Sequence, residues 1–305
     1  MSHGVERMTD FIGINWGSSN FRAYRIARDG MLVDSFAEPA GIGALDRAGM
    51  ARQIAGLVAR WPDCRPIYAS GMVGSNVGWV EVPYANCPAG LADVKAAAVT
   101  VDFGAVGVTI VPGMTCRRES DGGTDILRGE ETEIFGLAAL GGLSDGMVGL
   151  PGTHTKWARI GQGKVRDFAT SMSGEIFDRL TAQGLLASIV EGEAKDGEAF
   201  RAAVAQAYAR PLGLGTALFG VRAQVIRGEL GRVDAASTLR GLLIGTDMAD
   251  ALALFPDSFG ASIPLVGNAS LCALYAAALA MRGIDSHVFD ADRAALAGFS
   301  AIHTA

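Results

Sequence analysis

One short pattern occurs twice in this chain and limits its fold more than any other feature. GINWGSSNFRAYRI, residues 13–26, and LPGTHTKWARI, residues 150–160, each run from an apolar strand through a turn rich in glycine and hydroxyl side chains into a second strand. A cation follows each turn, Arg22 in the first copy and Lys156 in the second. The repeat indicates two related α/β halves, each beginning with an antiparallel β-meander.

Hydrophobic periodicity and turn signals extend this pattern along the chain. In the first half they predict strands at 11–14, 21–27, 31–37, 66–70 and 108–111 and helices at 47–61 and 125–139. In the second half they predict strands at 147–150, 156–160, 164–169, 262–266 and 285–289 and helices at 174–183, 198–208, 217–227, 235–254 and 270–283. We therefore predict an α/β protein of two domains, residues 1–143 and 144–305, that face one cleft.

Charge and composition argue against several classes of protein. The net charge is −6 and no run of Lys and Arg appears, so we expect no nucleic-acid partner. The four cysteines form no C-x-x-C pair and are expected to be reduced thiols. Residues 1–10 lack the apolar core of a signal peptide, and no apolar window is long enough to span a bilayer. We expect a cytoplasmic protein with no membrane partner.

The two repeated turns are longer than the two-residue turns that usually close a hairpin. The first contains Gly17, Ser18 and Ser19, and the second contains Gly152, Thr153 and His154. Successive backbone N–H groups with hydroxyls beside them form a concave site for anions, and glycine permits close approach of a ligand. One such turn alone is more simply an ordinary turn. Two on equivalent hairpins predict a pair of loops that hold a chain of phosphates between them.

A third motif, LVGNASLCALY at residues 265–275, adds a strand, a glycine-containing turn and a helix start. Together the three motifs resemble the phosphate and adenosine motifs of the actin, hexokinase and Hsp70 superfamily. The resemblance implies two ribonuclease-H-like domains with an interdomain cleft. It also implies that ATP is bound, with its phosphates at the two turns and its adenosine at Gly267, Asn268 and Ala269.

Further stretches narrow the resemblance. They are ASGMVGSNVGW at 69–79, LRGEETEIFG at 127–136, LPGTHTKW at 150–157 and GLLIGTDMA at 241–249. They are similar to the 2-dehydro-3-deoxygalactonokinase family over roughly residues 11–300. The resemblance implies Mg²⁺-dependent transfer of phosphate from ATP to the 6-hydroxyl of 2-dehydro-3-deoxy-D-galactonate, in galactonate catabolism. The gluconate-derived epimer competes as substrate, because the sequence does not reveal the configuration at C4.

The resemblance also assigns the catalytic and metal-binding residues. Related carbohydrate kinases carry a Gly-Asp at a helix start where this chain has Gly129 followed by Glu130 and Glu131. One of these carboxylates is expected to act as the base, with Glu130 slightly preferred, although an acidic first turn is also ordinary for a solvated helix. The first phosphate motif usually has Asp where this chain has Asn15. Asn15 is expected to reach Mg²⁺ through water, with the charge supplied by a carboxylate such as Glu130 or Glu131.

A sugar acid requires a cation for its carboxylate and polar groups for its hydroxyls. The candidates are Arg22, Ser75, Asn76, Trp79 and Arg128. The simpler alternatives are a surface ion pair for Arg128 and a core position for Trp79.

Two other functions remain open from sequence. One is a nucleotide hydrolase or phosphatase of the same superfamily, and the other is an ATP-binding regulator without turnover, which Asn15 favours. Ser75, Asn76 and Arg128 favour a kinase, because a hydrolase has no need of a sugar-acid pocket. A homodimer is possible, and the sequence does not decide it.

Overall fold

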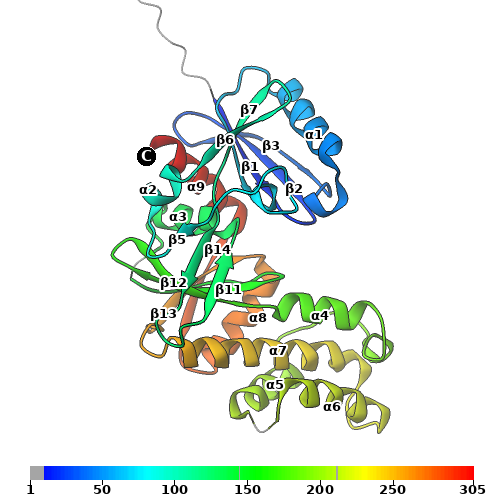
Figure 1. Ribbon diagram of the computed structural model, residues 1–305. Coiled ribbons are helices and arrows are strands. Elements are labelled where there is room, and N and C mark those ends of the chain that lie inside the picture. Colours follow the sequence, from blue (N-terminus) through cyan, green and yellow to red (C-terminus); the bar gives the residue numbers. More distant parts are fainter. Residues whose placement is uncertain (1–9, 144, 211) are drawn as a thin grey trace, which may run out of the picture.

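The computed structural model describes residues 10–143, 145–210 and 212–305, and its strands form three sheets (Figure 1). The first sheet has the order β3-β2-β1-β4-β7-β6. Its strands are β1 (Phe11–Trp16), β2 (Phe21–Ile26), β3 (Leu32–Glu38), β4 (Ile67–Gly71), β6 (Val99–Phe103) and β7 (Val106–Ile110). The second sheet has the order β12-β11-β10-β13-β14. Its strands are β10 (Gly146–Leu150), β11 (Thr155–Gly161), β12 (Lys164–Ser171), β13 (Ser262–Gly267) and β14 (Asp285–Asp290).

The third sheet is small and the helices complete the fold. It joins β5 (Ala85–Asn86), β8 (Met114–Arg117) and β9 (Thr124–Leu127). The helices are α1 (Arg47–Arg60), α2 (Leu91–Ala96), α3 (Glu130–Ala139), α4 (Ser173–Ala182), α5 (Glu198–Ala209), α6 (Leu214–Ile226), α7 (Arg232–Leu254), α8 (Ala269–Ala280) and α9 (Ala291–Thr304). Within the described ranges, none of them is both long and apolar enough to cross a membrane.

The five strands of the second sheet have the same order as five of the six strands of the first, and only β6 has no counterpart. The repeated motif predicts the shared meander. Strand β1 pairs antiparallel with β2 and parallel with β4, while β10 pairs antiparallel with β11 and parallel with β13. In both sheets the next strand of the meander, β3 or β12, adds to the outer side of β2 or β11. The prediction of an α/β fold with a duplicated meander is therefore confirmed.

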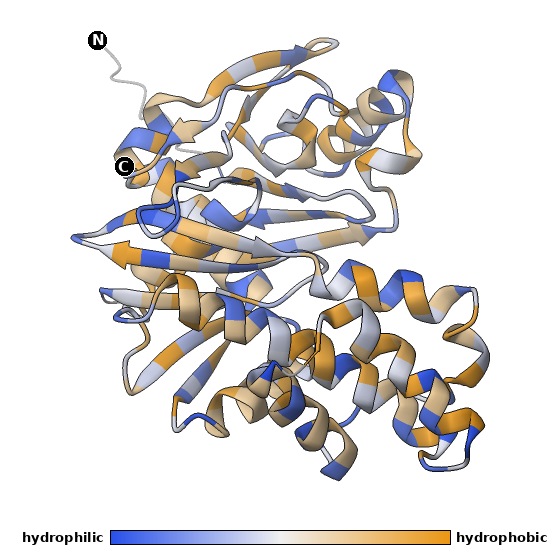
Figure 2. Cartoon of the chain, turned by 60° about the horizontal axis from the view of Figure 1, so that its bottom comes forward, coloured by the Kyte–Doolittle hydropathy of each residue, from blue (hydrophilic) through white to orange (hydrophobic). Residues whose placement is uncertain are grey.

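Helices α3 and α9 lie between the two large sheets (Figure 1). Side chains alternate across β1, so Ile12 and Ile14 share a core with Ile54 of α1, while Phe11 packs with Phe299 of α9. On the side of α3 and α9 that faces the second sheet, side chains of α3 share a core with β10 and β11. Figure 2 shows polar and apolar residues side by side along most strands and helices, as expected for elements with one buried face.

One core cluster contains side chains from both sides of residue 143. Cys116 and Leu127 of the small sheet and Phe135 of α3 pack with Val148 of β10 and Phe168 of β12. The helix α9, at the end of the chain, packs in turn against the first sheet. The boundary between 1–143 and 144–305 stays a prediction.

The helix predicted over residues 125–139 is wrong at its start. Residues Thr124–Leu127 form β9, paired antiparallel with β8, and α3 begins only at Glu130. Gly129 separates the two elements with a φ of 112°, a backbone conformation that favours glycine. The chain therefore turns sharply just before Glu130.

Helices α3 and α9 approach so closely that only glycine fits at their crossing. A Cβ on Gly298 would lie 2.0 Å from the carbonyl oxygen of Thr132, whereas one on Gly56 of α1 would meet nothing within 4 Å. We expect Gly298→Ala to lower the free energy of unfolding by about 1–3 kcal/mol, the usual cost of overpacking. Gly56→Ala, the matched control, should stabilise the chain slightly. Thermal melts of both variants test this, and an unchanged melting temperature for Gly298→Ala would contradict the crossing.

Candidate active site

The first glycine-hydroxyl turn follows the carboxyl end of β1. Its carbonyl groups are held by N–H groups of residues 41–43. The N–H groups of Ile42, Gly43 and Gly41 donate to the carbonyls of Gly17, Ser18 and Ser19, respectively, at 3.0–3.2 Å. The backbone N–H groups of Ser18 and Ser19 have no acceptor within the described residues. The turn therefore presents donors to solvent, as an anion site requires.

The second turn follows β10, and one of its N–H groups, that of Gly152, donates to a side chain of the protein. The Gly152 N–H donates to Thr155 Oγ1 at 3.3 Å, and the Glu175 N–H donates to the Thr153 carbonyl at 2.8 Å. His154 Nε2 lies 2.7 Å from Glu175 Oε2, which lowers the pKa of that carboxyl. The N–H groups of Thr153 and His154 have no acceptor in the described part of the chain. These two, rather than that of Gly152, are the free donors.

A glycine supports each turn from behind. A Cβ on Gly41 would lie 2.2 Å from the Ser18 carbonyl oxygen, and a Cβ on Gly174 would lie 2.3 Å from the Gly152 carbonyl oxygen. Real Cβ atoms do not approach so closely, so both turns rest directly on a neighbouring backbone. The equivalence of the two hairpins thus extends to their surroundings.

The start of α3 connects the two hairpins. Lys156 Nζ, on β11, lies 2.6 Å from Glu130 Oε1 and donates to the His154 carbonyl at 3.0 Å. The backbone of Gly129 comes close to Gly71 at the end of β4, where a Cβ would be 3.4 Å from the Gly71 Cα. Gly71 in turn packs on the carbonyl of Trp16, at the end of β1. Glu130 therefore lies between the strand ends that carry both turns.

The two candidate bases differ in accessibility. Glu131 is fully buried and accepts the Gly129 N–H at 2.6 Å. Burial, and then the charge of Glu130, raise the pKa of Glu131 to about 8. The Glu130 side chain keeps 23% of its surface exposed. Only Glu130 is open to a substrate hydroxyl, which favours it as the base.

Asn15 and Arg22 are cross-strand neighbours on β1 and β2. Arg22 Nη1 lies 3.7 Å from Asp292 Oδ1, so its charge is partly compensated. Ser70 of β4 also pairs with Asn15, and its buried hydroxyl has no partner among the described residues. Burial and the neighbouring carboxylates, Glu130 first among them, raise the pKa of Glu133 to about 8. This region thus combines one unpaired buried hydroxyl, that of Ser70, with several carboxylates.

Arg128 is a half-buried cation with unused donors. Its Nη2 donates to the Val82 carbonyl at 2.8 Å, and its guanidinium stacks 4.2 Å from the Tyr84 ring centre. Its Nε and Nη1 are buried and have no acceptor in the described chain. A Cβ on Gly74 would lie 2.9 Å from Nη1, so Arg128 borders the glycine-rich loop at the end of β4, residues 71–78. Among the described residues, Arg128 has no partner for the surface ion pair considered from sequence.

Other substrate candidates serve the protein itself in this structure. Ser75 is buried and its hydroxyl donates to the Met72 carbonyl at 2.7 Å. Trp79 stacks on Phe103 with ring centres 4.1 Å apart, which agrees with the core alternative. Asn76 is exposed.

The adenosine motif lies beside the second turn. A Cβ on Gly267 would lie 2.7 Å from the Pro151 carbonyl oxygen, which precedes Gly152. Asn268 caps α8, because its Oδ1 accepts the N–H groups of Ser270 and Leu271. Ala269 is the first residue of that helix. Asn268 therefore has a structural role as a helix cap, which the superfamily resemblance does not imply.

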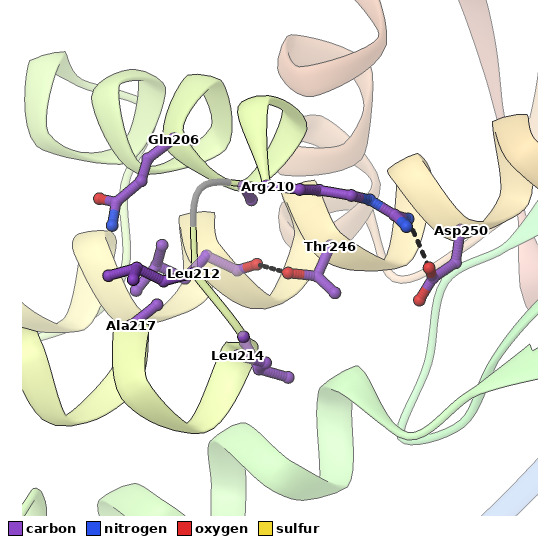
Figure 3. A pocket seen from close by; sticks show the side chains of 10 residues that line it. Gln206, Arg210, Leu212, Leu214, Ala217, Thr246 and Asp250 are labelled. Atoms are coloured by element: carbon purple, nitrogen blue, oxygen red, sulfur yellow. Dashed lines mark hydrogen bonds and ion pairs between the residues drawn. The ribbon is translucent and has the colours of Figure 1, made fainter.

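The described residues contain no group of three or more acidic, histidine or cysteine side chains that could hold a metal by themselves. A cavity of about 380 Å³ lies elsewhere, between α5, α6 and α7 (Figure 3). Gln206, Arg210, Thr246 and Asp250 supply its polar lining, and Arg210 pairs with Asp250. None of the predicted site residues lines it.

The comparisons with known proteins decide between the functions left open by the sequence. The family model described as 2-keto-3-deoxy-galactonokinase matches residues 15–302. The chain belongs to this family. It is 33% identical over 296 residues to a protein of Rhizobium meliloti (strain 1021) named a probable 2-dehydro-3-deoxygalactonokinase, with 95% of each chain covered. It is 32% identical to the 2-dehydro-3-deoxygalactonokinase of Escherichia coli (strain K12), covering 96% of this chain and 97% of that one.

Solved structures agree with the family. A crystal structure of a Sinorhizobium meliloti protein, provisionally described as a 2-dehydro-3-deoxygalactonokinase, superposes with a TM-score of 0.87 at 32% identity, covering 96% of this kinase and 97% of that chain. The activator of the 2-hydroxyisocaproyl-CoA dehydratase from Clostridium difficile gives a TM-score of 0.53 at 11% identity, which reports a shared fold alone. The family resemblance is confirmed, and the chain is a member of a carbohydrate kinase family rather than of a hydrolase or regulator family.

Sequence reasoning missed two residues of this kinase. Lys156 was noted only as the cation after the second turn, although it occupies the place that Arg22 has in the first hairpin. That equivalence was the available signal for Lys156. Ser70 gave no signal, because its unpaired hydroxyl becomes evident only once β4 is paired with β1.

Proposed function

We propose that this kinase transfers the γ-phosphoryl group of ATP to the 6-hydroxyl of 2-dehydro-3-deoxy-D-galactonate. The observation that carries the proposal is the 2.6 Å contact between Lys156 and Glu130, which joins the second turn to the carboxylate at the start of α3. Phosphoryl transfer depends mainly on positioning and on stabilising negative charge, so a carboxylate beside two donor-rich turns supplies what the reaction needs.

The two turns bind the phosphates from opposite sides in this proposal. The first turn offers the free N–H groups of Ser18 and Ser19, with Gly17 giving access, and the second offers those of Thr153 and His154. We infer that these turns belong to two domains, residues 1–143 and 144–305, that close on the nucleotide across a cleft. Gly267 and Ala269 form the adenosine side, next to the second turn.

Glu130 orients the accepting hydroxyl and takes its proton as the bond to phosphorus forms. Lys156 holds the Glu130 carboxylate in place through an ion pair in which the lysine side chain is only 7% exposed. Such a charge-assisted contact fixes orientation more firmly than a neutral hydrogen bond. Glu130 Oε2 also accepts the backbone N–H of Arg128 at 3.1 Å, so the protein positions both oxygens of the carboxylate.

The sugar acid is bound by the glycine-rich loop and Arg128. The buried Nε and Nη1 of Arg128 lack acceptors, and an unsatisfied buried donor is costly. A substrate carboxylate would accept a charge-assisted hydrogen bond from one of these nitrogens. The exposed amide of Asn76 would contact a hydroxyl of the substrate.

A divalent cation such as Mg²⁺ would neutralise charge on the phosphates during transfer. Asn15 would contribute its amide oxygen to a water of that ion, and Glu130 would supply a negative charge near it. The unpaired hydroxyl of Ser70 beside Asn15 offers a further polar contact.

The test is a coupled assay of ADP release over a panel of keto-deoxy sugar acids that differ in configuration at C4. We expect slow release with ATP alone and rapid release when 2-dehydro-3-deoxy-D-galactonate is added, with a lower rate for the gluconate-derived epimer. Identification of the 6-phosphate by mass spectrometry and NMR completes the assignment. Equal ADP release with and without every sugar acid would contradict the proposal.

A further inference from the structure

Asp247 is a buried carboxylate in the middle of α7 that the proposed chemistry does not use. It accepts hydrogen bonds from Trp157 Nε1 at 2.8 Å, Tyr275 OH at 2.5 Å and Ser173 Oγ at 3.0 Å. The three donors come from three different elements, β11, α8 and α4. A carboxylate that is only 3% exposed and receives three donors acts as a fixed acceptor at which these elements meet.

A line of hydrogen bonds runs from this carboxylate to the second phosphate turn. Tyr275 OH lies 2.9 Å from Thr155 Oγ1, and Thr155 Oγ1 accepts the Gly152 N–H at 3.3 Å. A hydroxyl donates only one proton. Since Tyr275 donates to Asp247, its oxygen is an acceptor for Thr155, at 2.9 Å against 3.5 Å for the other acceptor of the Thr155 hydroxyl, the Gly152 carbonyl. Donation to Tyr275 leaves the lone pairs of Thr155 for the Gly152 N–H. The carboxylate therefore favours one direction along the line, from Gly152 through Thr155 and Tyr275 to Asp247.

A second connection reaches the same turn through the start of α4. Ser173, which donates to Asp247, is followed by Gly174, and a Cβ there would lie 2.7 Å from the Thr153 Cα. The next N–H, from Glu175, donates to the Thr153 carbonyl at 2.8 Å. Asp247 thus anchors both the inner side of the turn and the helix start that forms its wall. Tyr275 also belongs to α8, the helix that begins at the adenosine motif.

We propose that Asp247 is a positioning residue for nucleotide binding. Acting through Tyr275 and Thr155, it holds the Gly152 N–H toward the protein interior. The N–H groups of Thr153 and His154 are then left to face the phosphates. This inference rests on the proposed function, because it takes the second turn to be a phosphate site. It concerns a residue without direct contact to substrate.

The sharpest test compares two substitutions of Thr155. Thr155→Val keeps the shape of the side chain but removes the hydroxyl, whereas Thr155→Ser keeps the hydroxyl. We expect Thr155→Val to raise the Kd for ATP about tenfold, the usual effect of losing a buried hydrogen bond, and Thr155→Ser to remain near wild type. Tyr275→Phe and Asp247→Asn should weaken ATP binding like Thr155→Val. The KM for the sugar acid should stay unchanged in all four variants.

Calorimetric titration with ATP separates this inference from the proposed function. A wild-type chain that binds no ATP would overturn the proposed function itself. A wild-type chain that binds ATP, with Thr155→Val and Tyr275→Phe binding it equally well, would overturn the role of Asp247 alone. If Thr155→Val does not fold, Tyr275→Phe, which loses a single oxygen atom, gives the same comparison. An equal rise in the constants for ATP and sugar acid would indicate general loosening and also contradict the inference.

Discussion

Replacing Glu130 by Gln should lower kcat by about 10²–10⁴-fold, the range for loss of a general base. The amide has the size of the carboxylate, and its one oxygen can accept from either the Lys156 ammonium or the backbone N–H of Arg128, but not from both. Because the Glu130 side chain is partly exposed, we expect the fold to persist. What is lost is the charge that orients the substrate hydroxyl and receives its proton. Steady-state kinetics with saturating ATP and sugar acid measure this effect, and unchanged thermal melting confirms an intact fold.

Glu131→Gln is the matched control for Glu130→Gln. Burial raises the pKa of Glu131 to about 8, so at pH 7 its carboxyl is mostly protonated and neutral. An amide therefore replaces a neutral group of the same shape, and kcat should remain close to wild type. Loss of activity in Glu131→Gln with retention in Glu130→Gln would reverse the assignment of the base.

Gly174→Ala should reduce kcat/KM for ATP by about 100-fold, because a misplacement of about 1 Å in a catalytic site has effects of that order. The added Cβ would lie 2.3 Å from the Gly152 carbonyl oxygen, so either the second turn or the start of α4 must move. The KM for the sugar acid should change much less, since Arg128 and the glycine-rich loop lie elsewhere. Kinetics with each substrate varied in turn measure the difference.

The control for Gly174→Ala is Gly220→Ala in α6. A Cβ on Gly220 would meet nothing within 4 Å. Alanine should stabilise that helix by up to about 1 kcal/mol through its higher helix propensity, with no change in kinetics. If Gly174→Ala behaves like Gly220→Ala, the second turn does not depend on its contact with α4.

Much of the fold was predictable because it repeats. Alternating apolar residues and the glycine-hydroxyl turns located both meanders, and the pairings of β1 and β10 confirm that they are equivalent. The strand β9 was missed because Thr124–Leu127 is short and its partner, β8, is defined only by tertiary packing. The helical periodicity of α3 extends back into residues 125–129. It therefore gives no sign that the chain turns at Gly129, where φ is positive.

The site was less predictable than the fold because its contacts join distant segments. Gly129 and Glu130 follow from a family pattern, but the ion pair of Glu130 with Lys156 depends on how α3 meets β11. The Gly152 N–H donates to Thr155 Oγ1, and Asn268 caps α8. Both contacts depend on local geometry, which cannot be read from the types of residue alone. Sequence therefore identified the turns correctly as units but not which of their atoms are free.

The most direct test of the account is a crystal structure of the chain with a non-hydrolysable ATP analogue and the sugar acid. We expect the phosphates to accept hydrogen bonds from Ser18 and Ser19 on one side and from Thr153 and His154 on the other. We also expect a Glu130 oxygen within hydrogen-bond reach of the 6-hydroxyl of the substrate. Phosphates that contact only one of the two turns, or a hydroxyl far from Glu130, would contradict it.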